Sequence, residues 1–466
     1  MPDTTSTSQP GQSQQTSSLA LSICVGWGLG SVGVAMMYGV TNLLILRFMT
    51  DYLGIAAVAG GLVIGLSKLY DAITDPIMGV VSDRTKSRWG RRRPYMFVGG
   101  FLLAASMILL FNVPAFESTT NTLLYMLILL LFYATAYTIF NVPYLAMPAE
   151  MTEGYHERSF LISFRVYGVA AAGIFGLFGG PMLIELFGAG QAGHAAMAWV
   201  LGAIILVSAL ASFWMTRDAP FTQESASIKY TFREQFSTAI ENKPYLLLLG
   251  SKLAGLFGFA LSQPAIAFFY TNVLEVTDDF LGYYFLVFYI FMIGSQSFWI
   301  RVSKLRGKKL IFMLCISLNM LGNLSWLLAG PEEPFSVMLL RALLLGFIGG
   351  GSLLMGQSML PDTIEYDYRR TGLRREGIFA AFFTTIEKIA YTIGPAVTGI
   401  FLGAMGYISS KGSQDIVQPD SAITAIYICV GVIPATMGIF GLLFLSAYDL
   451  TEEKLKSTAR VSMKRS

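Results

Sequence analysis

The chain has 466 residues, of which 54% are hydrophobic and only 13% are charged, and its mean hydropathy is +0.59. Soluble domains carry about 25% charged residues, so this composition excludes a water-soluble protein and predicts an integral membrane protein. The net charge of +3 does not indicate nucleic-acid binding, because the cations fall in short segments between hydrophobic runs.

The polar N-terminal segment 1–18 has no Lys or Arg, and we expect it to be a disordered cytoplasmic tail. Long hydrophobic runs without alternation follow as far as residue 448, which favours helices over the strands of a barrel. At roughly 20 residues per crossing, the runs accommodate about 12 transmembrane helices. The longest polar stretch divides the runs six and six, as in many secondary transporters. The predicted organisation is an N-terminal bundle, a cytoplasmic linker, a C-terminal bundle and a C-terminal cytoplasmic tail: 19–217, 218–243, 244–448 and 449–466.

The positive charges predict the orientation. Of the 32 Lys and Arg residues, 24 lie in five segments that share one side of the predicted membrane: 84–93, 217–243, 301–309, 369–375 and 454–465. Loops of the other side carry mainly Asp and Glu. By the positive-inside rule both termini are cytoplasmic, and the protein lies in the plasma or inner membrane, in contact with lipid.

Residue types for catalysis are scarce. The three cysteines lie in apolar runs without paired spacing, and there are only two histidines, so we expect no disulfide, metal cluster or cofactor. A polytopic membrane enzyme is a remote alternative, since it would need a nucleophile and base or a metal set. The pattern Gly28-Leu29-Gly30-Ser31-Val32-Gly33 matches a dinucleotide fingerprint, but no strand precedes it, and close helix packing explains it better.

The second hydrophobic run contains three ionisable residues, Lys68, Asp71 and Asp75. Offsets of three and seven residues place them on one face of a helix, which cannot face lipid because each charge at the bilayer centre costs about 2.5–3.5 kcal/mol. Two carboxylates at i and i+4 can bind a hard cation or share a proton. We predict a coupling site for Na⁺ or H⁺ here, and no other metal; a structural Lys–Asp bridge is the alternative.

Arg165 in the fifth run and Lys388 in the eleventh are each about ten residues from a polar boundary. They belong to opposite halves and could meet an anionic or hydroxyl-rich ligand in a central cavity. Tyr38 and Tyr144 are candidates for stacking on such a ligand. Lys252 and Arg341 lie nearer to helix ends, where a structural role is favoured.

Three segments resemble the glycoside–pentoside–hexuronide:cation symporter family of the major facilitator superfamily, which includes the melibiose permeases. The segments are DAITDPIMGVVSDRTKSRWGRRRPY at 71–95, NVPYLAMPAEMT at 141–152 and MLPDTIEYDYRRTGLRREGIFAAFF at 359–383. The resemblance covers residues from about 20 to 448. It implies a 12-helix major facilitator fold and cation-coupled symport of a sugar, glycoside or hexuronide by alternating access.

Carried over by position, the resemblance places the family's cation site on Asp71, Thr74, Asp75 and Thr138. Thr74 stands where melibiose permeases typically have an asparagine, so the choice between Na⁺ and H⁺ stays open. The family's basic substrate-site residues match Arg165 and Lys388, which burial had already singled out.

Three positions depart from the melibiose permeases. Ala35 and Asn141 replace carboxylates and Leu145 replaces a tryptophan, which argues against a galactoside. Asn141 can still bind substrate, and with Arg165 and Lys388 retained the pocket suits an anionic sugar or a phosphate head group. The alternative substrate is a lysolipid or another amphiphile, for which Ala35 and Leu145 would make room.

Charged loops suggest gates on the cytoplasmic side. The predicted gating residues lie in or beside the basic loops of each half: Asp83, Arg84, Arg88, Arg91, Asp362 and Glu365. Topology alone is the other explanation for the basic residues. We expect a monomer whose partners are a small-molecule substrate and membrane lipids.

Overall fold

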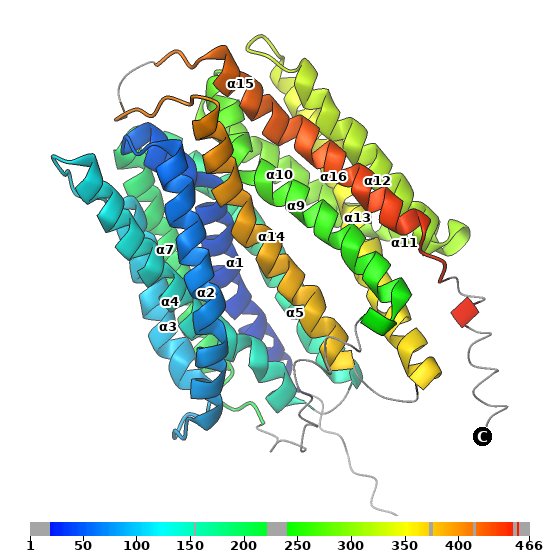
Figure 1. Cartoon of the computed structure of the whole chain (residues 1–466). Coiled ribbons are helices and arrows are strands. Elements are labelled where there is room, and N and C mark those ends of the chain that lie inside the picture. The colour runs from blue at the N-terminus through cyan, green and yellow to red at the C-terminus, as the bar shows by residue number, and fades with distance from the viewer. Residues whose placement is uncertain are drawn as a thin grey trace, which may run out of the picture.

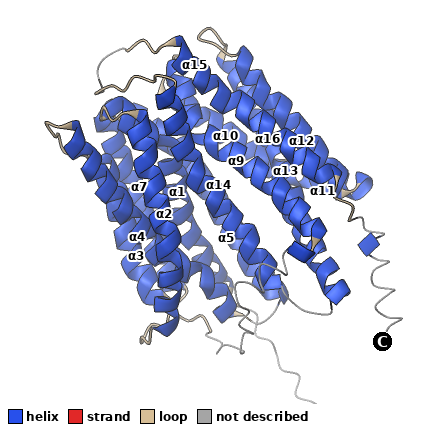
Figure 2. Cartoon of the chain, in the orientation of Figure 1, coloured by secondary structure: helices blue, strands red, loops and turns tan. Residues whose placement is uncertain are grey.

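The computed structural model describes residues 19–152, 155–220, 240–371, 376–412, 416–450 and 454–455. All regular secondary structure within these residues is helical (Figure 2). The predicted tail 1–18, most of the predicted linker and most of the segment 449–466 lie outside the described residues.

Helices of the first half follow one another with short connections. Their bounds are α1 (Leu21–Arg47), η1 (Phe48–Tyr52), α2 (Ala57–Arg84), α3 (Arg93–Phe111), α4 (Thr119–Met151), α5 (Tyr155–Ala172), η2 (Gly173–Phe178), α6 (Gly179–Leu186) and α7 (Gly190–Met215). The segments η1 and η2 are π-helical turns that continue the helices before them.

The second half has the same all-helical character. Its elements are α9 (Lys243–Asn272), α10 (Asp278–Gly294), α11 (Gln296–Arg306), α12 (Lys308–Leu324), η3 (Ser325–Leu328), α13 (Phe335–Thr371), α14 (Glu376–Ala404), α15 (Asp420–Tyr427), η4 (Ile428–Val432) and α16 (Ile433–Ser446).

Ten of these helical segments are long and apolar enough to cross a membrane, and the bent pair α10–α11 gives an eleventh. This confirms the prediction of an integral membrane protein. The remaining predicted span corresponds to α14, of which the part Ile389–Ala404 qualifies as a shorter apolar helix among the described residues. Twelve crossings therefore stay a prediction.

The helices form two packed groups that meet along the middle of the molecule (Figure 1). In the first group α1 packs on α5 and α7, while α3 packs on α4 and α7. In the second, α9 packs on α14 and α16, and α13 packs on α10 and α12. The groups touch where α14 packs on α2, α9 on α1, and α10 on α6 and η2.

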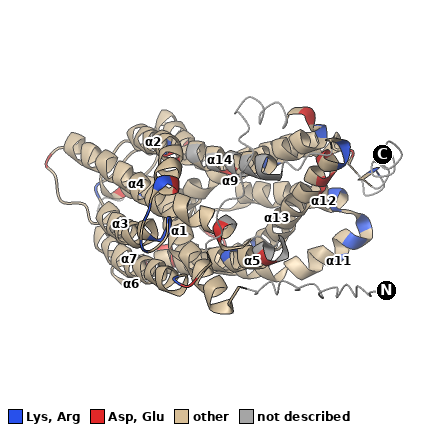
Figure 3. Cartoon of the chain, turned by 90° about the horizontal axis from the view of Figure 1, so that it is seen from below, with Lys and Arg blue, Asp and Glu red and all other residues tan. Residues whose placement is uncertain are grey.

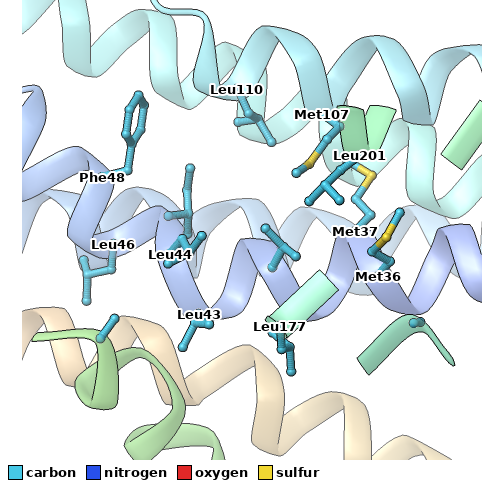
Figure 4. Close-up of a cluster of buried hydrophobic side chains, with 14 of the residues drawn as sticks. Met36, Met37, Leu43, Leu44, Leu46, Phe48, Met107, Leu110, Leu177 and Leu201 are labelled. Atoms are coloured by element: carbon cyan, nitrogen blue, oxygen red, sulfur yellow. The ribbon is translucent and has the colours of Figure 1, made fainter. Parts of the chain in front are cut away.

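Buried apolar side chains of α1 hold the first group together. Met36, Met37 and Leu44 are each at most 1% exposed and lie among side chains of α3 and α7, including Met107 and Leu201 (Figure 4). Seen from below, most of the ribbon is uncharged, and Lys, Arg, Asp and Glu lie mainly at helix ends and loops of that side (Figure 3). This is the distribution that a bilayer requires.

The glycine pattern of α1 is a packing motif, as predicted. A Cβ on Gly28 would lie 2.8 Å from the carbonyl oxygen of Phe164, and one on Gly33 would lie 2.7 Å from the hydroxyl of Ser208. Only glycine lets α5 and α7 approach α1 this closely.

The two ends of the bundle differ in how the halves are joined. We call the end with segments 84–93 and 301–309 the basic side, and the end with segments 51–56 and 405–412 the acidic side. On the acidic side the two halves are bound to each other. The amides of Ser410 and Gly412 donate to the carbonyls of Thr50 and Asp51, each at 2.9 Å. The hydroxyl of Tyr407 also donates to the Asp51 carboxylate at 2.7 Å.

Candidate functional site

A cavity of about 280 Å³ lies between the two halves. Its first-half lining comes from α1, α4, α5 and η2: Ser31, Val34, Ala35, Tyr38, Gly39, Tyr137, Asn141, Tyr144, Arg165, Val169, Ala172, Gly173 and Leu177. Its second-half lining comes from α9, α10 and α14: Phe259, Gln263, Tyr289 and Tyr391. Four of the five predicted substrate residues, Tyr38, Asn141, Tyr144 and Arg165, therefore meet in one place.

Arg165 gives the cavity a positive charge. It lies on α5 at the cavity wall and is half-buried. Its guanidinium makes no hydrogen bond or ion pair with any side chain that the structure describes. A guanidinium can bind a carboxylate or sulfonate with two parallel hydrogen bonds, so it suits an anionic group of a ligand.

Asn141 contributes an amide from α4. Its side chain is only 5% exposed and, within the described part of the chain, has no hydrogen-bond partner. Buried amides are normally paired, because leaving one unpaired costs free energy. An amide offers two donors and one acceptor, which matches the hydroxyl groups of a sugar.

Aromatic rings complete the wall. The ring of Tyr38 lies 5.8 Å from that of Tyr137 and 5.7 Å, edge to face, from that of Tyr391 in the second half. Tyr144 offers a ligand mainly its ring and not its hydroxyl group. The hydroxyl donates to the Trp27 carbonyl at 2.8 Å, and the ring stacks on Trp27. Such rings can pack against the apolar face of a sugar.

The acid pair of α2 faces α4. The hydroxyl oxygen of Thr138 lies 2.8 Å from Oδ1 of Asp71 and 2.9 Å from Oδ1 of Asp75. A hydroxyl has one proton, so it can donate to only one of the two carboxylates at a time. Two carboxylates held on one hydroxyl repel each other unless a proton or a cation lies between them. All three oxygens are hard ligands of the kind that Na⁺ prefers.

Thr74 and Lys68 flank this pair. The Thr74 hydroxyl lies 3.5 Å from that of Thr138 and also donates to backbone carbonyls of its own helix at 3.2 Å. Lys68 is 7% exposed, and its ammonium lies over the rings of Tyr38 and Tyr133 at 4.6 and 5.3 Å. It forms no ion pair with any carboxylate in the described part of the chain, so the alternative of a Lys–Asp bridge is not what the structure shows.

Helix α4 connects the acid pair to the cavity. Thr138 contacts the acids, while Asn141, three residues further and on the same face of the helix, lines the cavity. A shift of α4 on cation binding would therefore move a residue of the cavity wall.

In α14, the side chain of Lys388 lies outside the described part, so the structure does not place this predicted substrate residue. Leu145 is 40% exposed and is not part of the cavity wall, whereas Ala35 is.

A second ionic contact lies toward the basic side of the cavity. The ammonium of Lys252 on α9 donates to Glu387 Oε1 on α14 at 2.6 Å and to the Phe383 carbonyl at 3.1 Å. Arg341 pairs with Glu333 through both terminal nitrogens, at 2.6 and 2.7 Å. Both cations bind within the second half, as the structural reading of Lys252 and Arg341 predicts.

Two of the predicted gating residues of the first half, Asp83 and Arg91, belong to an ion-pair cluster around Arg92. This buried side chain donates to Asp83 and, at 2.9 Å, to Glu150, which also pairs with Arg91 at 3.4 Å. Arg84 is exposed, and the Arg88 guanidinium lies over the Trp89 ring at 5.2 Å. The link to Glu150 on α4 was missed in the sequence because 58 residues separate it from Arg92.

In the second half, Lys308 pairs with Asp362 and Arg369 pairs with Glu365, each at 2.6 Å. As on the first half, these predicted gating residues pair inside their own half. Across the residues that the structure describes, no ion pair joins the halves on the basic side. The polar contacts between the halves are instead those of the acidic side.

The sequence analysis missed the second-half wall of the cavity, Phe259, Gln263 and Tyr289. An aromatic residue in an apolar run has no distinguishing signal. Gln263 could have been noticed as an uncharged polar residue in the seventh run, next to Pro264. Its burial and its place opposite Arg165 come only from the tertiary structure.

Most of the chain matches known transporters. Residues 26–452 match the family described as MFS/sugar transport protein. The chain belongs to this family. Its members include the glycoside–pentoside–hexuronide:cation symporters that the three sequence segments resemble, and the fold is that of the major facilitator superfamily.

Two relatives and one solved structure document the match. The chain is 28% identical to the "Uncharacterized symporter YnaJ" of Bacillus subtilis over 94% of this chain and 93% of that protein. It is 26% identical to the "Glucuronide carrier protein homolog" of Escherichia coli over 93% of each. The crystal structure of a D-xylose-proton symporter superposes with a TM-score of 0.62 at 15% identity, covering 94% of this chain and 98% of that one. This chain is therefore a sugar-transport protein of the major facilitator superfamily.

Proposed function

We propose that this family member carries an anionic sugar, such as a hexuronate, and that the acid pair of α2 binds the coupling Na⁺ or H⁺. The observation that supports the substrate class is the unpaired Arg165 guanidinium in a cavity whose other polar groups are uncharged amides and tyrosines. A relative named as a glucuronide carrier homolog supports the same class.

The coupling step begins at the acids. A cation that joins Asp71, Asp75 and the Thr138 hydroxyl removes the repulsion between the carboxylates and draws α4 toward α2. This movement shifts Asn141 within the cavity wall, where the sugar binds between Arg165 and the second half. Each net charge that crosses the membrane gains about 2.3 kcal/mol per 100 mV, which is enough to concentrate the solute without nucleotide hydrolysis.

Transport follows from alternating access between two six-helix halves, 19–217 and 244–448. The contacts of the acidic side belong to a conformation in which that side is closed. With the basic side cytoplasmic, as the positive-inside rule predicts, this is the state that releases sugar into the cell. The Arg92 and Asp362 clusters would pair across the halves when the basic side closes.

The second candidate is a carrier of an amphiphile such as a lysolipid, and the lining of the cavity separates it from a sugar carrier. Beside its apolar residues the cavity wall carries five tyrosines, two amides and Arg165, and Leu145, which would have widened it for an acyl chain, is not part of the wall. This favours a hydroxyl-rich solute.

Uptake into proteoliposomes tests the proposal. D-glucuronate and D-glucose share a ring and differ in the carboxylate, so they are a matched pair of probes. We expect a Na⁺ or H⁺ gradient to drive accumulation of D-glucuronate in preference to D-glucose. Asp75→Asn should retain exchange of substrate but lose accumulation. Equal uptake of both sugars would refute the anionic class, and full accumulation by Asp75→Asn would refute the coupling site.

A further inference from the structure

Gln263 is the one residue of the described second-half wall whose polar group is an amide. It lies on α9, between Ser262 and Pro264, and reaches the same cavity as Arg165 and Asn141 of the first half. The other described second-half residues of the wall are Phe259, Tyr289 and Tyr391. Gln263 is therefore the residue of this wall that offers two donors as well as an acceptor from one side chain.

The Gln263 amide has no partner in the described part of the chain. The side chain is 7% exposed, and no hydrogen bond joins it to any other residue in the described ranges. Its amide atoms are not fully buried, so they are open to the cavity that the residue lines. An amide in this position offers two donors and an acceptor to a molecule that enters the cavity.

Three amides outside the cavity wall, of which Asn242 caps the start of α9, behave differently. Asn42 donates to the Tyr38 carbonyl at 2.8 Å, and Asn242 donates to the Thr363 carbonyl at 2.8 Å. Gln296 donates to the carbonyls of Met292 and Gly350, each at 3.3 Å. These amides stabilise helices and their packing. Gln263 makes no such contact with the described residues, so packing does not explain it.

We propose that Gln263 binds a ring hydroxyl of the transported sugar and sets the choice among sugars that differ at that hydroxyl. This inference deepens the proposed function and rests on it. With Asn141 on α4 and Gln263 on α9, the sugar would be held by an amide from each half. A sugar without the matching hydroxyl would leave the Gln263 amide buried and unpaired, which is the condition under which a site discriminates most strongly.

Contact with both amides would also make the bound sugar favour closure of the cavity. Each half holds the ligand by its own polar groups, so the fully bound state forms only when the halves have approached. A ligand that lacks the Gln263 contact would bind the first half but would favour closure less.

The experiment compares purified full-length protein with its Gln263→Leu variant, using D-glucuronate, D-glucose and the 2-, 3- and 4-deoxy analogues of each as probes. Leucine has a similar size and removes an unpaired amide, so we expect this variant to fold with equal or higher thermal stability. Binding by calorimetry should weaken by about 10- to 100-fold for the parent sugar. One deoxy analogue should bind wild type and Gln263→Leu with equal, weakened affinity, which identifies the hydroxyl. The matched control is Gln296→Ala, which removes a satisfied amide away from the cavity and should leave affinities unchanged.

The outcomes separate this inference from the proposed function. If Gln263→Leu binds the parent sugar with wild-type affinity while Arg165→Ala does not, the role of Gln263 is refuted and the sugar site stands. A uniform loss for the parent sugar and all its deoxy analogues would also refute hydroxyl recognition by Gln263. If wild type binds none of these sugars, both proposals fall. An equal loss of affinity in Gln296→Ala would show that the effect of Gln263→Leu is structural.

Discussion

The Arg47 guanidinium donates two hydrogen bonds to the carboxylate of Asp278, at 2.5 and 3.1 Å, although 231 residues separate them in the chain. Arg47 ends α1 and Asp278 begins α10, so the pair ties the first half to the second on the acidic side. Both side chains are buried, at 3% and 7% exposure. Without Asp278, Arg47 would keep only the more distant Asp51 of its own half, at 3.7 Å, so the ionic link between the halves would be lost and the closed state would be less favourable.

Asp278→Asn should therefore open the acidic side. The readout is an Ala35→Cys probe in the cavity wall, labelled by a membrane-impermeant maleimide added on the acidic side. The three natural cysteines are fully buried and give little background. We expect labelling to accelerate about tenfold, which corresponds to about 1.4 kcal/mol of shift. Gln191→Ala is the control, because Gln191 binds the Tyr52 carbonyl on the same side but within the first half. Unchanged labelling in a stable Asp278→Asn protein would contradict the role of the pair.

Helix packing closes the same side. A Cβ on Gly399 of α14 would lie 2.7 Å from the Cα of Gly61 on α2 and 2.8 Å from the Ala57 carbonyl oxygen, and neither backbone atom can yield easily. Gly399→Ala should therefore reduce uptake at least tenfold and expose Ala35→Cys to the acidic side. Gly255→Ala on α9 is the matched control, since its Cβ meets no atom within 4 Å. It should keep wild-type uptake and gain up to about 1 kcal/mol of stability from helix propensity. Equal uptake by both variants would show that the close approach is dispensable.

Thr138→Ala should weaken binding of the coupling ion. The variant loses the hydroxyl that holds both carboxylates, and a hydrogen bond to a charged group contributes about 1.5–3 kcal/mol. We expect the half-saturating Na⁺ or H⁺ concentration for uptake to rise at least tenfold. Thr135→Ala, one turn earlier on α4, removes a hydroxyl that binds Tyr70 and the Leu131 carbonyl instead. It should leave the ion dependence unchanged, and an equal shift in both variants would count against a specific site at Thr138.

Arg165→Gln should remove the preference for an anionic sugar over a neutral one. Glutamine keeps hydrogen-bonding capacity but removes the positive charge, so affinity for D-glucuronate should fall at least tenfold while that for D-glucose changes little. Competition of each sugar against the other in uptake measures the ratio. Arg165→Lys keeps the charge and should retain part of the preference. A parallel loss for both sugars would indicate that Arg165 positions the ring and does not read an anion.

Some of the site was predictable because its signal is local. Asp71 and Asp75 are four residues apart, so helical periodicity alone places them on one face, and the cost of burying charge excludes lipid on that face. The same cost singled out Arg165. Thr138 and Asn141 carry no charge, and only the resemblance to a known family brought them forward.

The sequence by itself determined the membrane class, the helical runs and the charged residues that must face the interior, because hydropathy, periodicity and the cost of buried charge act within one helix. The tertiary structure decided which helices meet. It brought Gln263 into the same cavity as Arg165, gave the contacts of the Thr138 hydroxyl with both carboxylates, and paired Arg47 with Asp278. These contacts join segments far apart in the chain, and their energies depend on helix packing that no local pattern encodes.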